Sequence, residues 1–127
     1  MKEHTRLPDT EQDVMNVLWQ TASPLSGAQI AAQLKQAHGW ADTTVLTLLQ
    51  RLEHKGFVTR EKQGRGYLYS AAVAQRDYLP QASRSFLEKL FGGSARNFMA
   101  ALNSEEKLTR SDIEELQQYL DELKRGL

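Results

Sequence analysis

The sequence contains no cysteine, and this absence excludes several kinds of protein at once. A disulfide-stapled secreted fold, a thiolate zinc site and a cysteine nucleophile all require the missing residue. The three histidines are scattered through 127 residues, with no second ligand at helical spacing. We therefore expect no metal site and no cofactor.

Long apolar runs are also missing. No stretch approaches the ~18 consecutive apolar residues of a membrane span, and the N-terminus lacks the apolar segment of a signal peptide. There is no glycine-rich phosphate loop, no His-Glu metal pair and no nucleophile in a recognisable turn. With 40% hydrophobic residues the chain can still bury a core. We expect a cytoplasmic protein that is not an enzyme and does not insert into a membrane.

The formal net charge is zero, which at first argues against a nucleic-acid partner. The distribution of charge is uneven, however. Six basic and three acidic residues lie between Lys35 and Arg65, whereas seven acidic and two basic residues lie between Asn103 and Glu122. This asymmetry indicates two different tasks within one chain.

Three helices are predicted in the first part of the chain. Apolar residues recur at helical spacing after Asp9 or Thr10, the expected N-cap. Ser26 and Gln29 form the pattern of a capping box before a second helix. A third helix is expected from about Asp42 to Gly56, a glycine suited to the left-handed position after a helix.

A hairpin is predicted directly after these helices. Residues 57–62 and 67–70 are β-prone, and the turn-like residues 63–66 separate them. Three helices followed by a hairpin are typical of a winged helix-turn-helix domain, which we assign to residues 1–72.

The rest of the chain has purely helical patterns. Apolar residues repeat at three and four up to Gly92-Gly93, residues 94–102 form a short helical segment, and Thr109 is expected to cap a last helix. Such short helices bury little by themselves, so we assign residues 73–127 to a helical dimerisation domain and expect a homodimer. The residues expected in the dimer interface are Leu79, Phe86, Leu90, Ile113, Leu116, Leu120 and Leu123.

The third helix is expected to turn one face to the core and the other to DNA. On a helical wheel one sector is apolar and must pack inward: Val45, Leu48, Leu49 and Leu52. The opposite side offers hydroxyl and amide groups for base edges, an apolar group for a thymine methyl and a cation for phosphate. Its residues are Thr43, Thr44, Leu46, Thr47, Gln50 and Arg51. A solvated helix face is the alternative, but three threonines in five residues lower helix propensity and so indicate another use for their hydroxyls.

Basic residues continue beyond this helix into the hairpin. A basic tip at Gly64-Arg65-Gly66 can approach the DNA backbone or the minor groove. Taken alone it is equally well a solvated turn, but together with the helix it favours DNA binding. The residues that complete the predicted DNA-binding set are Lys55, Arg60, Lys62 and Arg65. Trp19 and Trp40 are interpreted as packing residues.

Several segments together resemble the BlaI/MecI/CopY family of transcriptional repressors, the penicillinase repressor type. The resemblance covers nearly everything from Leu7 to Leu123. The segments that carry it are residues 14–19, 40–45, Arg51-Leu52, Lys55-Gly56-Phe57, residues 67–69, Gly92-Gly93, Asn97-Phe98 and residues 113–116.

The resemblance implies a homodimeric repressor of β-lactam resistance genes or of a related stress operon. It implies binding to an inverted-repeat operator on double-stranded DNA. It also implies release by a membrane-bound sensor-protease that cuts an Asn-Phe bond, and Asn97-Phe98 stands at the matching position. Phe98 as an ordinary core residue is the competing interpretation, and both can hold.

Two departures from the family pattern limit what is carried over. The copper-responsive members depend on a cysteine-rich tail, so metal sensing of that type is not expected here. At Thr43 and Leu46 the β-lactamase repressors carry longer polar or basic side chains. The operator sequence is therefore not carried over.

Three classes of function remain in order of preference. A DNA-binding repressor comes first, a winged-helix protein-interaction module without DNA binding comes second, and a small enzyme comes last. Among repressors, proteolytic release competes with a directly bound effector, and Asn97-Phe98 favours proteolysis.

Overall fold

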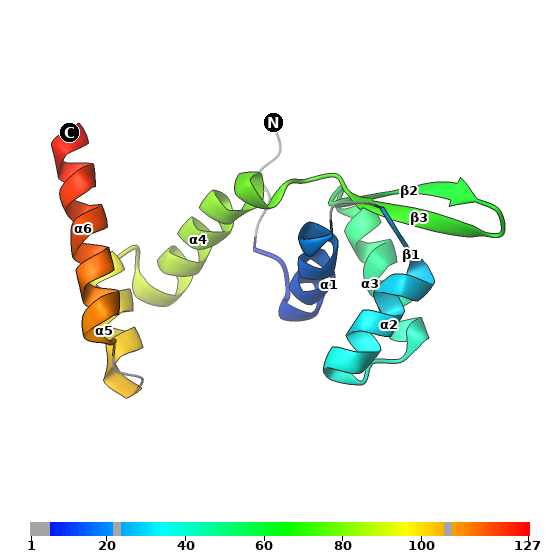
Figure 1. The fold of residues 1–127 in the computed structure, drawn as a ribbon, viewed down its shortest axis with the longest axis horizontal. Helices are drawn as coiled ribbons and strands as arrows, with labels where there is room; N and C mark the ends of the chain where they lie inside the picture. Colours follow the sequence, from blue (N-terminus) through cyan, green and yellow to red (C-terminus); the bar gives the residue numbers. More distant parts are fainter. Residues whose placement is uncertain (1–5, 22–23, 106–107) are drawn as a thin grey trace. The chain divides into compact units, whose positions relative to one another are not determined.

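A computed structural model describes residues 6–21, 24–105 and 108–127. The chain divides into two compact units, one ending at Ser85 and the other running from Phe86 to Leu127. The predicted fold class, mostly helical with a small antiparallel sheet, is confirmed (Figure 1).

The described residues of the first unit form three helices, a three-stranded sheet and the start of a fourth helix. In chain order these elements are α1 (Asp9–Gln20), β1 (Leu25–Ser26), α2 (Gly27–His38), α3 (Asp42–His54), β2 (Val58–Gln63), β3 (Gly66–Ala71) and α4 (Gln75–Phe91), which continues into the second unit.

Local sequence signals set most of the helix ends. Ser26 and Gln29 form the predicted capping box, with reciprocal bonds of 2.9 and 3.1 Å, and Gly39 ends α2 in the left-handed conformation. The predicted N-cap of α1 at Asp9 or Thr10 is wrong, because Pro8 occupies that position without a side-chain bond. Asp9 instead lies in the first turn, where its negative charge interacts favourably with the positive end of the helix dipole.

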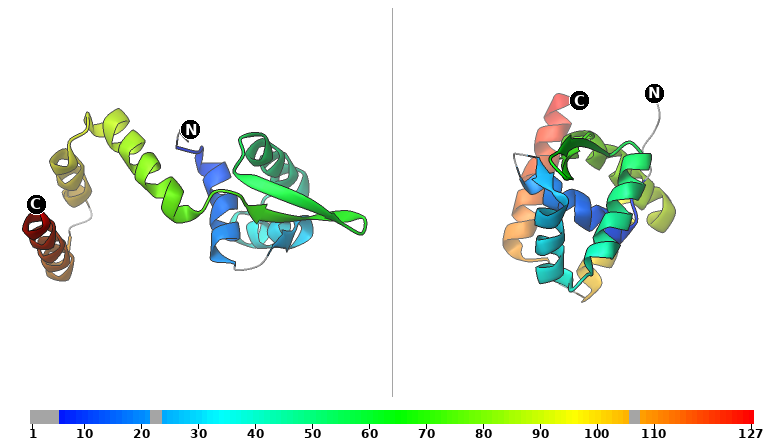
Figure 2. Two further views of the ribbon diagram at one scale, coloured as in Figure 1. Left: turned by 90° about the horizontal axis from the view of Figure 1, so that it is seen from above. Right: turned by 90° about the vertical axis from the view of Figure 1, so that its right-hand side faces the viewer.

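The hairpin is confirmed and is joined by a strand that the sequence did not reveal. The sheet is antiparallel with the order β1-β3-β2, and β1 adds only two residues, with Leu25 opposite Tyr69. The strands β2 and β3 extend from the helices to an exposed turn (Figure 2). Gly64 takes a positive φ of 60° there, which glycine adopts without a steric penalty.

One hydrophobic core holds the three helices, the sheet and the first part of α4 together. Tyr78 and Ala82 of α4 are buried in it. The Tyr78 hydroxyl accepts a hydrogen bond of 2.6 Å from the Leu7 backbone N–H, and the Trp19 indole donates one of 2.9 Å to the Val73 carbonyl. The division between units therefore falls after Ser85, whereas the sequence placed a domain boundary after residue 72.

The second unit contains the end of α4 together with α5 (Ala95–Glu105) and α6 (Arg110–Gly126). Thr109 caps α6 as predicted, in a capping box with Asp112. The rings of Phe86, Phe91 and Phe98 meet with centroids 5.5 to 6.1 Å apart. Neither α5 nor α6 has a fully buried residue among those described, so one copy of this unit leaves much apolar surface in water.

Candidate nucleic-acid interface

The recognition helix predicted from the sequence is α3, and its two faces are divided as expected. Val45, Leu48, Leu49 and Leu52 are all buried, which fixes the rotation of the helix in the core. The six residues of the predicted DNA-facing side are all exposed: Thr43, Thr44, Leu46, Thr47, Gln50 and Arg51. The helix thus carries a continuous strip of side chains available to a partner.

The hydroxyl of Thr47 is already engaged within the helix. It donates a hydrogen bond of 3.0 Å to the carbonyl oxygen of Thr43, which is the common way for a threonine to satisfy its proton inside a helix. The oxygen lone pairs and the methyl group of Thr47 remain available. Towards a base edge, Thr47 is therefore an acceptor or an apolar contact in this conformation.

Leu46 interrupts the polar strip with an exposed apolar group. Its exposed fraction is 48%, which is unusual for a leucine in a unit that buries its other large aliphatic residues on α3. An apolar side chain at this place suits a thymine methyl in a major groove. The alternative, a single leucine in water, needs no partner.

Arg51 extends the strip towards the end of α3. Its side chain is exposed, and no ion pair is recorded for it with any residue in the described part of the chain. Gln50 is exposed beside it. A guanidinium in this state can bind a phosphate oxygen without giving up an internal partner.

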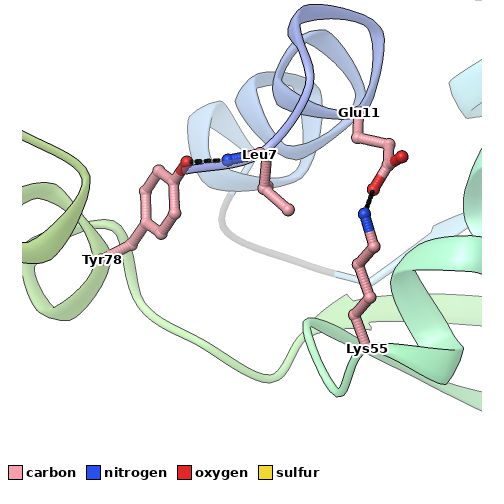
Figure 3. Close-up of polar contacts among 4 residues, drawn as sticks. All are labelled: Leu7, Glu11, Lys55 and Tyr78. Carbon is pink, nitrogen blue, oxygen red and sulfur yellow. Dashed lines mark hydrogen bonds and ion pairs between the residues drawn. The ribbon is translucent and has the colours of Figure 1, made fainter. Parts of the chain in front are cut away.

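Lys55, at the end of the same helix, is held by a buried carboxylate. Its Nζ donates a hydrogen bond of 2.5 Å to Glu11 Oε1 of α1, and Figure 3 shows the two side chains pointing toward each other. Glu11 is 3% exposed. Lys55 was predicted to bind DNA, whereas the structure gives its ammonium an internal partner. Glu11 was missed, although it lies in phase with Val14 and Leu18 on the apolar face of α1.

The wing is formed by β2, β3 and their turn. Lys62 and Arg65 are exposed near its end, with no ion pair recorded for either among the described residues. Arg60 is closer to the helices and has two partners, Glu53 of α3 and the ring of Tyr67. The predicted basic residues of the wing are thus in different states, and only Arg60 is tied to α3.

Both tryptophans pack as expected. The ring of Trp19 lies 5.6 Å from that of Tyr78, and Trp40 stacks on His38 with ring centroids 4.6 Å apart. Both also pack against the core. Neither is a candidate for base stacking.

Asn97 and Phe98 lie in the first turn of α5. Asn97 is exposed, and its backbone N–H donates to the Ser94 hydroxyl at 3.0 Å. The Phe98 N–H donates to the Ser94 carbonyl at 3.1 Å. The peptide bond that joins them is therefore part of a capped helix turn, with the Phe98 ring in the aromatic group of this unit.

The predicted dimer residues are surface residues of a single chain. Leu79 and Leu90 of α4 are exposed and Phe86 is half-buried. On α6 the exposed apolar residues are Ile113, Leu116, Leu120 and Leu123, with Tyr119 in addition.

Membrane-spanning helices and clusters of metal-ligating side chains are both absent from residues 6–21, 24–105 and 108–127. No helix there is long and apolar enough to cross a bilayer. No group of three or more histidine or acidic side chains gathers closely enough to hold a metal ion.

An exposed recognition helix, a buried opposite face and a basic hairpin define the first unit as a winged-helix domain of the kind found in transcriptional regulators. The chain belongs to the penicillinase repressor family, whose profile matches residues 7–122. The members of this family are transcriptional repressors and not enzymes, as the sequence predicted.

Two relatives illustrate the match. The penicillinase repressor of Bacillus licheniformis is 30% identical over 98% of this chain and 96% of its own length. The methicillin resistance regulatory protein MecI of Staphylococcus aureus (strain N315) is 28% identical over 91% of this chain and 93% of its own. Among solved structures, monomeric Bacillus licheniformis BlaI in complex with the blaP half-operator is 31% identical, with a TM-score of 0.52. The match covers 61% of this chain and 94% of that one.

Proposed function

We propose that this chain is a cytoplasmic transcriptional repressor that binds operator DNA as a homodimer. The exposed strip of α3 carries the proposal, because it combines groups that can contact base edges with the exposed guanidinium of Arg51, while the opposite face of the helix is buried. A relative with 31% identity was solved on its half-operator, which supports the same use of this domain.

In this function α3 enters the major groove and the wing lies against the backbone. Base edges meet Thr43, Thr44, Leu46, Thr47 and Gln50. Phosphates meet Arg51, Lys62 and Arg65, whose charges have no recorded ion pair within the described residues. These contacts would make binding salt-dependent even though the whole chain is neutral.

The second unit supplies the dimer contact. Its helices expose a row of apolar residues at three-four-three spacing on α6, and a second copy can cover this row. The two winged-helix domains of the dimer would then occupy the two halves of an inverted repeat. Because relatives are named for penicillinase and methicillin resistance, genes for β-lactam resistance or a related stress response are the proposed targets.

Proteolytic release by a membrane-bound sensor-protease is the proposed means of induction. The Asn97–Phe98 bond is the proposed target. Since the Phe98 N–H is bonded within a helix turn, a protease would need that turn to open before the bond could enter its active site. Release by a directly bound effector is the alternative.

The first test is a gel shift of the purified protein on its own upstream DNA, titrated with salt and with scrambled competitor. Specific binding at dimer stoichiometry, weakened by salt, is the expected result. Absence of binding at low salt by folded protein would contradict the proposal and would make the α3 strip a surface for a protein partner.

A further inference from the structure

Arg60 joins the recognition helix to the wing. Its Nε lies 3.1 Å from Glu53 Oε2 of α3, and its guanidinium carbon lies 4.2 Å from the ring centroid of Tyr67 on β3. Arg60 itself is on β2. One side chain thus contacts two neighbouring elements of the first unit.

The strand register explains why these groups meet. In the antiparallel pair Arg60 is opposite Tyr69 and Lys62 is opposite Tyr67. Residues two apart on a strand share a face, so Arg60 and Lys62 lie on the same face of the hairpin as the two tyrosines. Tyr69 is buried on this face, which is therefore the one turned to the core. Lys62 follows Arg60 towards the tip.

Glu53 lies at the end of the exposed strip of α3, whose side chains are proposed to contact the bases. It is three residues after Gln50 and seven after Leu46, so the three share one side of the helix. A lone carboxylate at this place would repel DNA phosphates. The bond to Arg60 neutralises it, and at the same time it uses the charge that Arg60 would offer to a phosphate.

The contact is suited to fixing geometry and not to raising stability. Both side chains are more than a third exposed, and ion pairs of that kind contribute little to the free energy of unfolding. A planar guanidinium, however, can stack on a ring and bond a carboxylate in one orientation, which the point charge of a lysine does not do.

We propose that Arg60 is a positioning residue of the DNA-binding surface. It holds the wing against α3, and so sets where Lys62 and Arg65 stand relative to the reading strip, and it makes no phosphate contact of its own. This inference rests on the proposed DNA-binding function, and its tests separate the two.

Glu53→Gln distinguishes the positioning role from a phosphate contact by the sign of its effect. If Arg60 positions the wing, E53Q weakens specific DNA binding by about fivefold or more. It also lowers the dependence of binding on salt, because Lys62 and Arg65 are no longer held where they can contact phosphates. The double variant E53Q/R60Q then binds no more weakly than R60Q alone. If Arg60 binds phosphate, E53Q strengthens binding by removing a repulsive charge and freeing the guanidinium, which would overturn the proposal.

Glu61→Gln is the matched control. Glu61 is on β2, next to Arg60, but its side chain is on the opposite face of the strand. E61Q therefore removes the same charge as E53Q without affecting the contact between Arg60 and Glu53. Its affinity for the operator should equal or slightly exceed that of the wild type. A loss for E61Q as large as that for E53Q would show a general effect of the charge and would contradict the positioning role.

A measurement without DNA tests the link independently. In NMR spectra of the protein without DNA, the Arg60 Nε–H should exchange with water more slowly than that of Arg65, and E53Q should abolish the difference. Equal exchange in the wild type would overturn the link. If the wild type binds no DNA at all, the proposed function fails, and this exchange measurement alone then decides whether Arg60 holds the wing.

Discussion

Glu11 and Lys55 form an ion pair of 2.5 Å across 44 residues of sequence, between the first turn of α1 and the end of α3 (Figure 3). The Glu11 side chain is buried, whereas 40% of the Lys55 side chain is exposed. A buried charge of this kind is costly without its partner. The pair therefore holds the end of the recognition helix against α1.

Lys55→Met should destabilise the first unit by about 1–3 kcal/mol, because it leaves the Glu11 carboxylate buried without a partner. The partly exposed Lys55 side chain lets water reach the site, which keeps the cost below that of a fully buried pair. Urea unfolding measures the effect. Lys62→Met is the matched control, since Lys62 has no recorded ion pair in the described residues. The pair would have no structural role if both variants unfolded at the same midpoint.

Thr47→Val should reduce discrimination between operator variants by about 1–3 kcal/mol while leaving dimerisation unchanged. Valine keeps the shape and one methyl group but removes the oxygen that can accept a bond from a base. Thr47→Ser keeps that oxygen and should retain more of the discrimination. Binding is compared across operators that differ at one base pair. If T47V and the wild type showed identical preferences among these operators, Thr47 would not be one of the residues that recognise bases.

Arg51→Ala should weaken binding to every duplex, specific or not, and lower the salt slope by about one phosphate. The reason is that its guanidinium is exposed and has no recorded ion pair among residues of the described chain. Affinities measured over a range of salt concentrations give the slope. Lys89→Ala, which removes a charge from the exposed side of α4, should leave the slope unchanged. An unchanged slope for R51A would show that Arg51 does not contact a phosphate of the DNA backbone.

Leu116→Asp with Leu120→Asp should give a monomer with weak operator affinity, because two charges would enter the apolar row of α6. Sedimentation measures the oligomeric state. Ser111→Asp with Gln118→Asp adds the same charge seven residues apart on the other side of the helix, and it should remain dimeric. A dimer in the first variant would show that this row is not the interface.

Local signals in the sequence predicted the elements well. The Ser26–Gln29 capping box is set by residues three apart, and the inward side of α3 follows from spacing alone. Contacts between distant segments were missed because they depend on residues that are far apart in the sequence. The two-residue strand β1 forms because Leu25 pairs with Tyr69, and nothing in the sequence around either residue indicates this pairing.

The same distinction applies to the candidate site. Which residues of α3 face outwards was predictable, whereas the engagement of Lys55 by Glu11 and of Arg60 by Glu53 depends on how α1 and the hairpin pack against α3. The division of the chain was hidden because α4 is one continuous helix. Its Tyr78 belongs to the core of the first unit, although the helix continues past Ser85.

The two faces of α3 have a consequence for how such proteins diverge. The residues that hold the helix in place, such as Val45 and Leu52, are separate from those that would meet bases, such as Thr43 and Leu46. Exchange of an outward side chain leaves the core untouched and so costs little stability. A gene duplicate could therefore acquire a new set of target promoters by a few substitutions on one helix, without passing through an unfolded ancestor.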